Sequence, residues 1–215
     1  MNADERPLVA VLDYGIGNLR SAEKALVRSG ADARLTADPG LIADAAGVVL
    51  PGVGAFGRCM EALADVGLTD IAFRAAAAAA EGGRPFAGIC IGMQMLYEGS
   101  DENPGVPGLG ALPGRIVRLP PGVKHPQMQW NILEPVKPSP LFDGLPDPAW
   151  VYFVHSYAPE DSDDTVGRCD YGGPVVAVAQ RGNLFATQFH PEKSGANGLR
   201  LLANLVDRCR QPVAP

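Results

Sequence analysis

The sequence lacks the features that would place it in a membrane, in the secretory pathway or on nucleic acid. No uncharged apolar run approaches the roughly 18 residues that a membrane helix needs. Residues 2–6 have neither the basic start nor the long apolar stretch of a signal peptide, so we expect no secretory signal. Lys and Arg number 18 against 24 Asp and Glu, and this net charge of −6 argues against a protein that coats nucleic acid.

Histidine and cysteine are also scarce. The chain has three histidines and four cysteines, and no two cysteines form a CxxC pair, which argues against a structural zinc site. A chain of 215 residues does not need disulfide bonds for stability. We therefore expect reduced thiols, a cytoplasmic location, no metal and no cofactor. The cysteines are Cys59, Cys90, Cys169 and Cys209.

The first half of the chain alternates short apolar runs with helical patterns. Apolar residues make up 47% of the sequence, enough for a sizeable core. A strand, a turn, a helix and another strand in repeated order indicate parallel βαβ units. Strands are predicted at residues 7–13, 31–35, 47–50 and 84–89, and helices at 18–29, 59–63, 68–81 and 92–97.

The second half, from about residue 103, is richer in Pro and Gly. It predicts short strands that add to one side of the parallel sheet, several of them antiparallel. We expect one α/β domain over residues 1–215, with a mostly parallel central sheet. The predicted strands are 114–118, 150–154, 175–179 and 184–189, and a closing helix at 195–208 turns Leu199, Leu202, Leu205 and Val206 inward.

Cys90 lies where a predicted strand meets a predicted helix, between Gly88 and Gly92. This layout is typical of a nucleophile elbow, whose sharp turn pushes one side chain outward. Free N–H groups and the helix dipole at a helix N-terminus favour the thiolate, which is the reactive form. The alternative is a buried cysteine that packs as a small apolar residue. The other three cysteines lack the glycine frame, so we interpret them as structural.

His190 and Glu192 flank Pro191 near the end of the chain. Proline disfavours the helical conformation for the residue before it, so the segment should be extended, with both side chains on one side. Glu192 would then orient His190 as a base for Cys90. The alternatives are a surface histidine beside a solvated acid, or a metal site. A metal site lacks a third ligand, because His125 and His155 belong to other segments.

Five segments together resemble the class I (triad) glutamine amidotransferases. More narrowly, they are similar to the glutaminase subunits of imidazole glycerol phosphate synthases in histidine biosynthesis. The resemblance runs nearly end to end. The segments are residues 13–19 (DYGIGNL), 50–56 (LPGVGAF), 88–94 (GICIGMQ), 152–157 (YFVHSY) and 188–194 (QFHPEKS).

The resemblance implies a flavodoxin-like three-layer fold and a Cys90, His190 and Glu192 triad that releases ammonia from glutamine. It implies a (β/α)8-barrel cyclase subunit as partner in a heterodimer, which receives the ammonia. The residues that it assigns to the oxyanion and substrate are Gly52, Val53, Ile91, Gln94, Glu102, Ser156 and Tyr157. Those that it assigns to the partner interface are Asn18, Gln127, Gln129, Trp130 and Tyr152.

One segment departs from the family pattern. The family usually has Pro-His-Met-Gly-Trp-Asn where this chain has Pro126-Gln127-Met128-Gln129-Trp130-Asn131. If the Gly position needs a positive φ, Gln129 is strained there. This hypothesis leaves room for a second function, an amidotransferase that supplies ammonia to another acceptor in a sugar or secondary-metabolite pathway. A third, of a different class, is a non-catalytic regulatory subunit.

Overall fold

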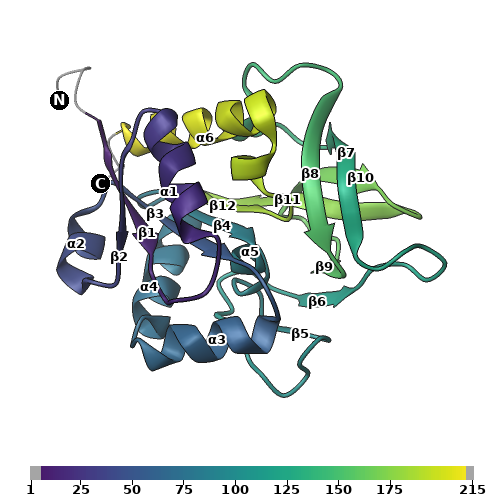
Figure 1. Ribbon diagram of the computed structural model, residues 1–215, viewed down its shortest axis with the longest axis horizontal. Coiled ribbons are helices and arrows are strands. Elements are labelled where there is room, and N and C mark those ends of the chain that lie inside the picture. The colour runs from purple at the N-terminus through teal and green to yellow at the C-terminus, as the bar shows by residue number, and fades with distance from the viewer. Residues whose placement is uncertain (1–5, 212–215) are drawn as a thin grey trace.

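The computed structural model describes residues 6–211, which form a nine-stranded sheet between two layers of helices (Figure 1). The five strands from β2 to β12 are parallel, and the four that follow are antiparallel to their neighbours. In spatial order the strands are β2 (Asp32–Thr36), β1 (Leu8–Leu12), β3 (Gly47–Gly52), β4 (Phe86–Cys90), β12 (Leu184–Thr187), β11 (Pro174–Arg181), β10 (Thr165–Asp170), β7 (Gln127–Pro135) and β8 (Ala149–His155).

Helices cover both faces of the sheet. In Figure 1, α1 (Leu19–Arg28) and α6 (Gly195–Cys209) lie together on one face, with α3 (Phe56–Asp65) and α4 (Thr69–Ala80) on the other. A second sheet consists of β5 (Gly99–Ser100), β6 (Arg115–Arg118) and β9 (Tyr157–Pro159). The remaining elements are α2 (Pro39–Asp44), α5 (Ile91–Gln94), η1 (Pro140–Phe142) and η2 (Pro191–Lys193). Within residues 6–211, no helix is both long and apolar enough to span a membrane.

The predicted α/β architecture is confirmed, including the antiparallel strands on one side of a parallel sheet. Seven elements were not predicted: the helix α2, the strands β5, β7, β9 and β10, and the short helices η1 and η2. Helix α2 has clear local signals, because Asp38 accepts hydrogen bonds from the first-turn N–H groups and Pro39 opens the helix. In α6, Leu199 is only partly buried, although it packs against the core.

The helix predicted at residues 92–97 is wrong in extent, because α5 has only four residues. The carbonyl groups of the following residues accept hydrogen bonds from a loop instead. The Leu109 N–H donates to the Met95 carbonyl, and the Leu112 N–H donates to the Leu96 carbonyl. These tertiary contacts replace the next helical turn, so the dipole expected from a longer helix is largely missing.

The sheet brings two distant parts of the sequence together. Strands β4 and β12 are parallel neighbours, and Ile89 is paired with Thr187. Because both strands end at the same edge, Cys90 and the segment that starts at Gln188 leave the sheet side by side. The two chemically suggestive segments of the sequence therefore meet.

Candidate active site

Cys90 occupies a strained turn between β4 and α5. Its φ of 56° and ψ of −111° make it the one non-glycine residue with positive φ among the described residues. Such a conformation costs about 1–3 kcal/mol and is typical of functional sites. The glycine frame permits close packing, since a Cβ at Gly92 would lie 1.8 Å from the Leu50 carbonyl oxygen. The predicted elbow geometry is confirmed.

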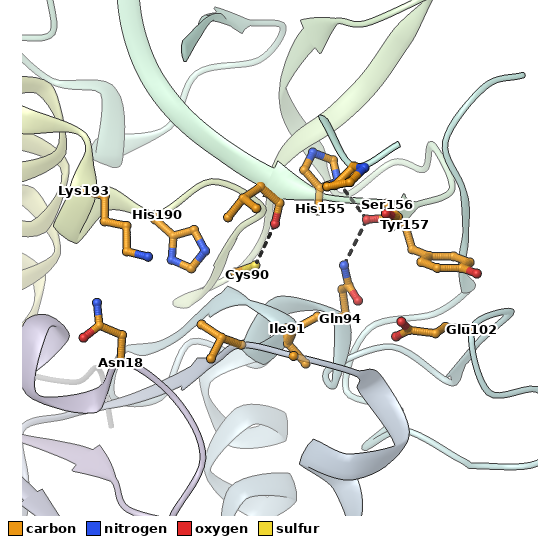
Figure 2. A pocket seen from close by; sticks show the side chains of 14 residues that line it. Asn18, Cys90, Ile91, Gln94, Glu102, His155, Ser156, Tyr157, His190 and Lys193 are labelled. Carbon is orange, nitrogen blue, oxygen red and sulfur yellow. Dashed lines mark hydrogen bonds between the residues drawn. The ribbon is translucent and has the colours of Figure 1, made fainter. Parts of the chain in front are cut away.

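His190 and Glu192 form a buried pair. The Nδ1 of His190 lies 2.8 Å from Oε1 of Glu192, and the two side chains are 2% and 3% exposed. The backbone of His190 is extended before Pro191, as predicted. A hydrogen bond from Nδ1–H to the carboxylate leaves Nε2 as the atom that can exchange a proton with other groups. Figure 2 shows the His190 ring beside Cys90.

The electrostatics of the site favour a protonated His190. Burial alone would lower its pKa, but hydrogen bonding and charge at Cys90 and Glu192 outweigh burial and raise the pKa to about 9. The Nε2 atom nevertheless has no partner that meets strict hydrogen-bond geometry within residues 6–211. Catalytic hydrogen bonds are often long or poorly aligned before substrate binds, so the missing contact does not exclude Nε2 as the proton donor.

Two glutamines connect the Cys90 sulfur to the backbone of Tyr157 through hydrogen bonds. Gln188 donates from Nε2 to the Cys90 sulfur at 3.8 Å. Gln94 donates from Nε2 to the Gln188 Oε1 at 3.1 Å and to the Tyr157 carbonyl at 2.9 Å. Gln188 was not among the predicted site residues. Its spacing two residues before His190 in an extended segment was the available signal.

A pocket of about 420 Å³ opens over Cys90. It contains the predicted catalytic cysteine and histidine, most of the predicted substrate residues and one predicted interface residue, and Figure 2 shows their side chains. Glu192 contacts His190 but is not among the lining residues. The residues that line the pocket are Asn18, Val53, Gly54, Cys90, Ile91, Gln94, Glu102, Pro126, Val154, His155, Ser156, Tyr157, His190 and Lys193.

His155 is a pocket residue that the sequence did not single out. Its Nδ1 hydrogen-bonds to the Tyr157 carbonyl at 2.9 Å, and its Nε2 has no partner among the described residues. Burial lowers its pKa to about 4, so it is neutral near pH 7. Groups of three or more His, Cys, Asp or Glu side chains placed to hold a metal ion are absent from residues 6–211.

Gly52 and Val53 lie beside the nucleophile turn. Gly52 is paired with Cys90 at the end of β3, and a Cβ on Gly52 would lie 2.7 Å from the Gly92 nitrogen. The Val53 carbonyl accepts a hydrogen bond from the Cys59 thiol at 3.3 Å. The cysteine interpreted as structural therefore supports this loop.

Glu102 has a structural contact as well as a place in the pocket. Its Oε2 accepts a hydrogen bond from the Phe56 N–H at 2.8 Å, which caps the start of α3. Asn103 caps the next N–H, that of Gly57, at 2.9 Å. The loop from Val53 to the start of α3 is thus held against the segment that carries Glu102.

An exposed apolar surface lies next to the pocket on β7 and β8. Trp130 and Tyr152 are paired in register, with ring centroids 6.0 Å apart. The exposed fractions are 61% for Met128, 47% for Trp130 and 46% for Trp150. Exposed apolar groups of this size, when contiguous, mark sites of interaction. Asn18, the one predicted interface residue that lines the pocket, directly precedes α1, but its side chain makes no capping hydrogen bond to the helix backbone.

Gln127 and Gln129 behave differently from expectation. Gln127 is fully buried and donates from Nε2 to the Cys169 sulfur at 3.8 Å, so its side chain is not at the surface for direct contact with a partner. Gln129 is exposed in β7 and does not have a positive φ. The hypothesis of backbone strain at Gln129 is wrong, because an extended strand accepts any L-residue.

Comparison with known proteins agrees with this geometry. The family model "Glutamine amidotransferase class-I" matches residues 10–209. The chain is 51% identical to the imidazole glycerol phosphate synthase subunit HisH of Symbiobacterium thermophilum, over 91% of this chain and 92% of that protein. The subunit of the same name from Methanothermobacter thermautotrophicus is 47% identical, over 94% of this chain and 100% of that protein.

Two solved structures share the fold at low sequence identity. A glutamine amidotransferase crystal structure superposes with a TM-score of 0.72 at 21% identity, covering 94% of this chain and 98% of that one. The structure of PurLQS from Thermotoga maritima gives 0.69 at 21% identity, covering 94% and 99%. At this identity the match concerns the fold alone.

Proposed function

The chain belongs to the class I glutamine amidotransferase family, and on that premise we propose that it is the glutaminase subunit of an imidazole glycerol phosphate synthase, acting as one glutamine amidotransferase type 1 domain. The observation that carries the proposal is the meeting of a strained Cys90 with the buried His190–Glu192 pair at one pocket. The chemistry needs no metal or cofactor.

In the first half of the proposed reaction, the Cys90 thiolate attacks the side-chain amide carbon of glutamine. The carbonyl oxygen becomes an oxyanion while the new C–S bond forms. His190, which keeps its proton near neutral pH, donates that proton to the amide nitrogen as the C–N bond breaks. Ammonia leaves, and a glutamyl thioester remains on Cys90.

In the second half, water attacks the carbonyl carbon of the thioester. His190, now neutral, accepts a proton from the attacking water, and the C–S bond breaks to release glutamate and the Cys90 thiolate. Glu192 stabilises the positive charge that returns to the imidazole. The buried 2.8 Å contact supports this role, because a carboxylate that solvent cannot reach holds the ring in one tautomer.

Backbone N–H groups near Gly52 and Val53, together with the Ile91 N–H, are the proposed oxyanion donors. Their position beside the nucleophile supports this role, and a lost donor of this type typically costs about a hundredfold or more in rate. Gln94, Glu102, Ser156 and Tyr157 are proposed to bind the amino-acid end of glutamine, and all four line the pocket.

The proposed partner is a (β/α)8-barrel cyclase subunit that forms a heterodimer with this chain. The exposed apolar side chains of β7 and β8 support an interface there, with Trp130, Tyr152, Gln129 and Asn18 among its residues. Free ammonia is mostly protonated at neutral pH and then has no lone pair for attack. A closed route from the pocket into the partner would keep it reactive.

A glutaminase assay with and without the barrel cyclase tests the proposal. We expect slow hydrolysis by the chain alone, faster hydrolysis with the partner and its ligand, and ammonia transfer to the ribonucleotide precursor of imidazole glycerol phosphate. Cys90→Ser should lose the activity, whereas Cys209→Ala, a change at another buried cysteine, should keep it. Equal turnover by Cys90→Ser and wild type would show that the cysteine is not the nucleophile.

The second candidate, ammonia supply to another acceptor, was motivated by Gln127 and Gln129. The burial of one and the unstrained backbone of the other remove much of that motivation. A partner-dependent glutaminase that transfers no ammonia to the histidine-pathway precursor would favour this candidate.

A further inference from the structure

The side chains of Gln94 and Gln188 form a directional hydrogen-bond chain that ends on the nucleophile. The Gln94 amide donates to Tyr157 and Gln188, so both its N–H groups are in use. Gln188 accepts through Oε1, which directs its own N–H groups toward Cys90. The orientation of the second amide is therefore fixed by the first.

The two glutamines of this hydrogen-bond chain lie in the protein interior, where hydrogen bonds to charged atoms have their largest effect. Gln188 has no exposed surface and Gln94 is 1% exposed. A donor aimed at sulfur favours the thiolate over the thiol, because only the charged form gains strongly from an N–H group. Because Gln188 is itself fully buried and does not line the pocket, its N–H groups do not hydrogen-bond to solvent instead of the sulfur.

Few other groups can supply charge to the sulfur. His190, backed by Glu192, is the cation that faces it. The hydroxyl of Tyr14 and the thiol of Cys59 also act on this region, and burial raises the pKa of both, so they stay neutral. Further groups in the pocket are the neutral His155 and the side chains of Glu102 and Lys193.

We propose that Gln188 is a catalytic residue that holds the Cys90 sulfur as a thiolate and in the attacking orientation, and that Gln94 fixes it in that role. Gln94 has one free polar atom, Oε1, which is buried, has no partner within the described residues and belongs to a side chain that lines the pocket. An acceptor there suits a donor group of the substrate. Substrate contact at Gln94 would thereby steady the donor that holds the nucleophile.

The test compares Gln188→Leu and Gln188→Met with wild type. Both variants remove the amide, and methionine keeps the unbranched length of the side chain. If both variants have the same effect, that effect comes from the lost N–H donor and not from a change in side-chain shape. Gln180→Leu is the matched control, since Gln180 is a partly buried glutamine of β11 that does not line the pocket. Thermal unfolding of each variant checks that it is folded.

The first readout is the rate of Cys90 alkylation by iodoacetamide against pH. We expect the midpoint of this profile to rise by about half a pH unit or more in both Gln188 variants and to stay unchanged in the control. The second readout is glutaminase turnover with the cyclase partner, where kcat should fall about tenfold or more. An unchanged alkylation profile in both variants would overturn the proposal, even if activity fell, because the residue would then be only structural.

The catalytic meaning of this inference rests on the proposed function, but the alkylation readout does not. Absence of glutaminase activity in wild type, with the predicted shift in the alkylation profile still present, would reject the proposed function and keep the role of Gln188 at the sulfur. Activity in wild type with no shift in the variants would do the reverse.

Discussion

The His190 imidazole is held 2.8 Å from the Glu192 carboxylate, and almost no solvent reaches either side chain. A carboxylate in this place orients the ring and stabilises its positive charge. Glu192→Gln should therefore lower kcat about a hundredfold with KM little changed, because the charge matters most in the transition state. Steady-state glutaminase kinetics of the complex check this. Glu81→Gln, a change at an exposed glutamate, is the control, and equal losses in both would contradict the assignment.

The same pair predicts how stability depends on pH. Against burial, which lowers it, Cys90 and Glu192 raise the pKa of His190 from 6.5 to about 9 in the folded state. Because the pKa of His190 is higher in the folded protein than in the unfolded chain, protonation of His190 stabilises the fold. This stabilisation is complete at pH values below the unfolded-state pKa of about 6.5, and it is lost as pH rises from about 6.5 through about 9. The free energy of unfolding of wild type minus that of Glu192→Gln should fall across this window. Urea unfolding at several pH values measures it, and a difference that grows with pH would refute the assignment.

Local sequence rules predicted each half of the site, but not their meeting. The glycines around Cys90 and the proline after His190 determine backbone geometry within a few residues, so single segments are enough to recognise them. That β12 lies directly beside β4 depends on packing across the whole sheet. No local pattern contains that information, and the family resemblance supplied it in the sequence analysis.

The elements that were missed have similar causes. The helix expected after Cys90 stops at Gln94, because a loop takes the next carbonyl groups. Strand β7 has mixed polar and apolar residues because one face is partly buried and the other carries the exposed Met128 and Trp130. Gln127, beside them in sequence, points the other way. The alternation of a strand explains both positions, once the strand is known.

The close approach at the nucleophile turn predicts a strict need for glycine at position 92. A Cβ there would lie 1.8 Å from the Leu50 carbonyl oxygen, so β3 and α5 would have to separate. Gly92→Ala should reduce the free energy of unfolding by about 2 kcal/mol or more and abolish turnover. Gly105→Ala is the matched control, since a Cβ at Gly105 meets no atom within 4 Å. Denaturant unfolding compares the two, and equal stability would show that the turn relaxes easily.

The extended backbone at Gln129 gives a prediction opposite to that of a strained residue. If Gln129 were strained, Gln129→Gly would stabilise the protein. Since its φ is not positive, glycine should instead reduce the free energy of unfolding by about 0.5–1 kcal/mol, because it raises the entropy of the unfolded chain. Urea unfolding of the isolated chain measures this, and a stabilised variant would restore the strain hypothesis.

Trp130 should contribute more to partner binding than any polar neighbour in the proposed interface. Its ring is 47% exposed, lies against Tyr152 and stands on the strand pair that borders the pocket. Removing a tryptophan from the centre of an interface costs about 2 kcal/mol or more, so Trp130→Ala should weaken cyclase binding about thirtyfold. Val136→Ala removes another exposed apolar side chain, just beyond the end of β7, and serves as the control. Titration calorimetry with the purified barrel measures both affinities. Unchanged affinity in Trp130→Ala would move the interface away from β7 and β8, and a loss of fold would be seen as a lowered Tm of the free subunit.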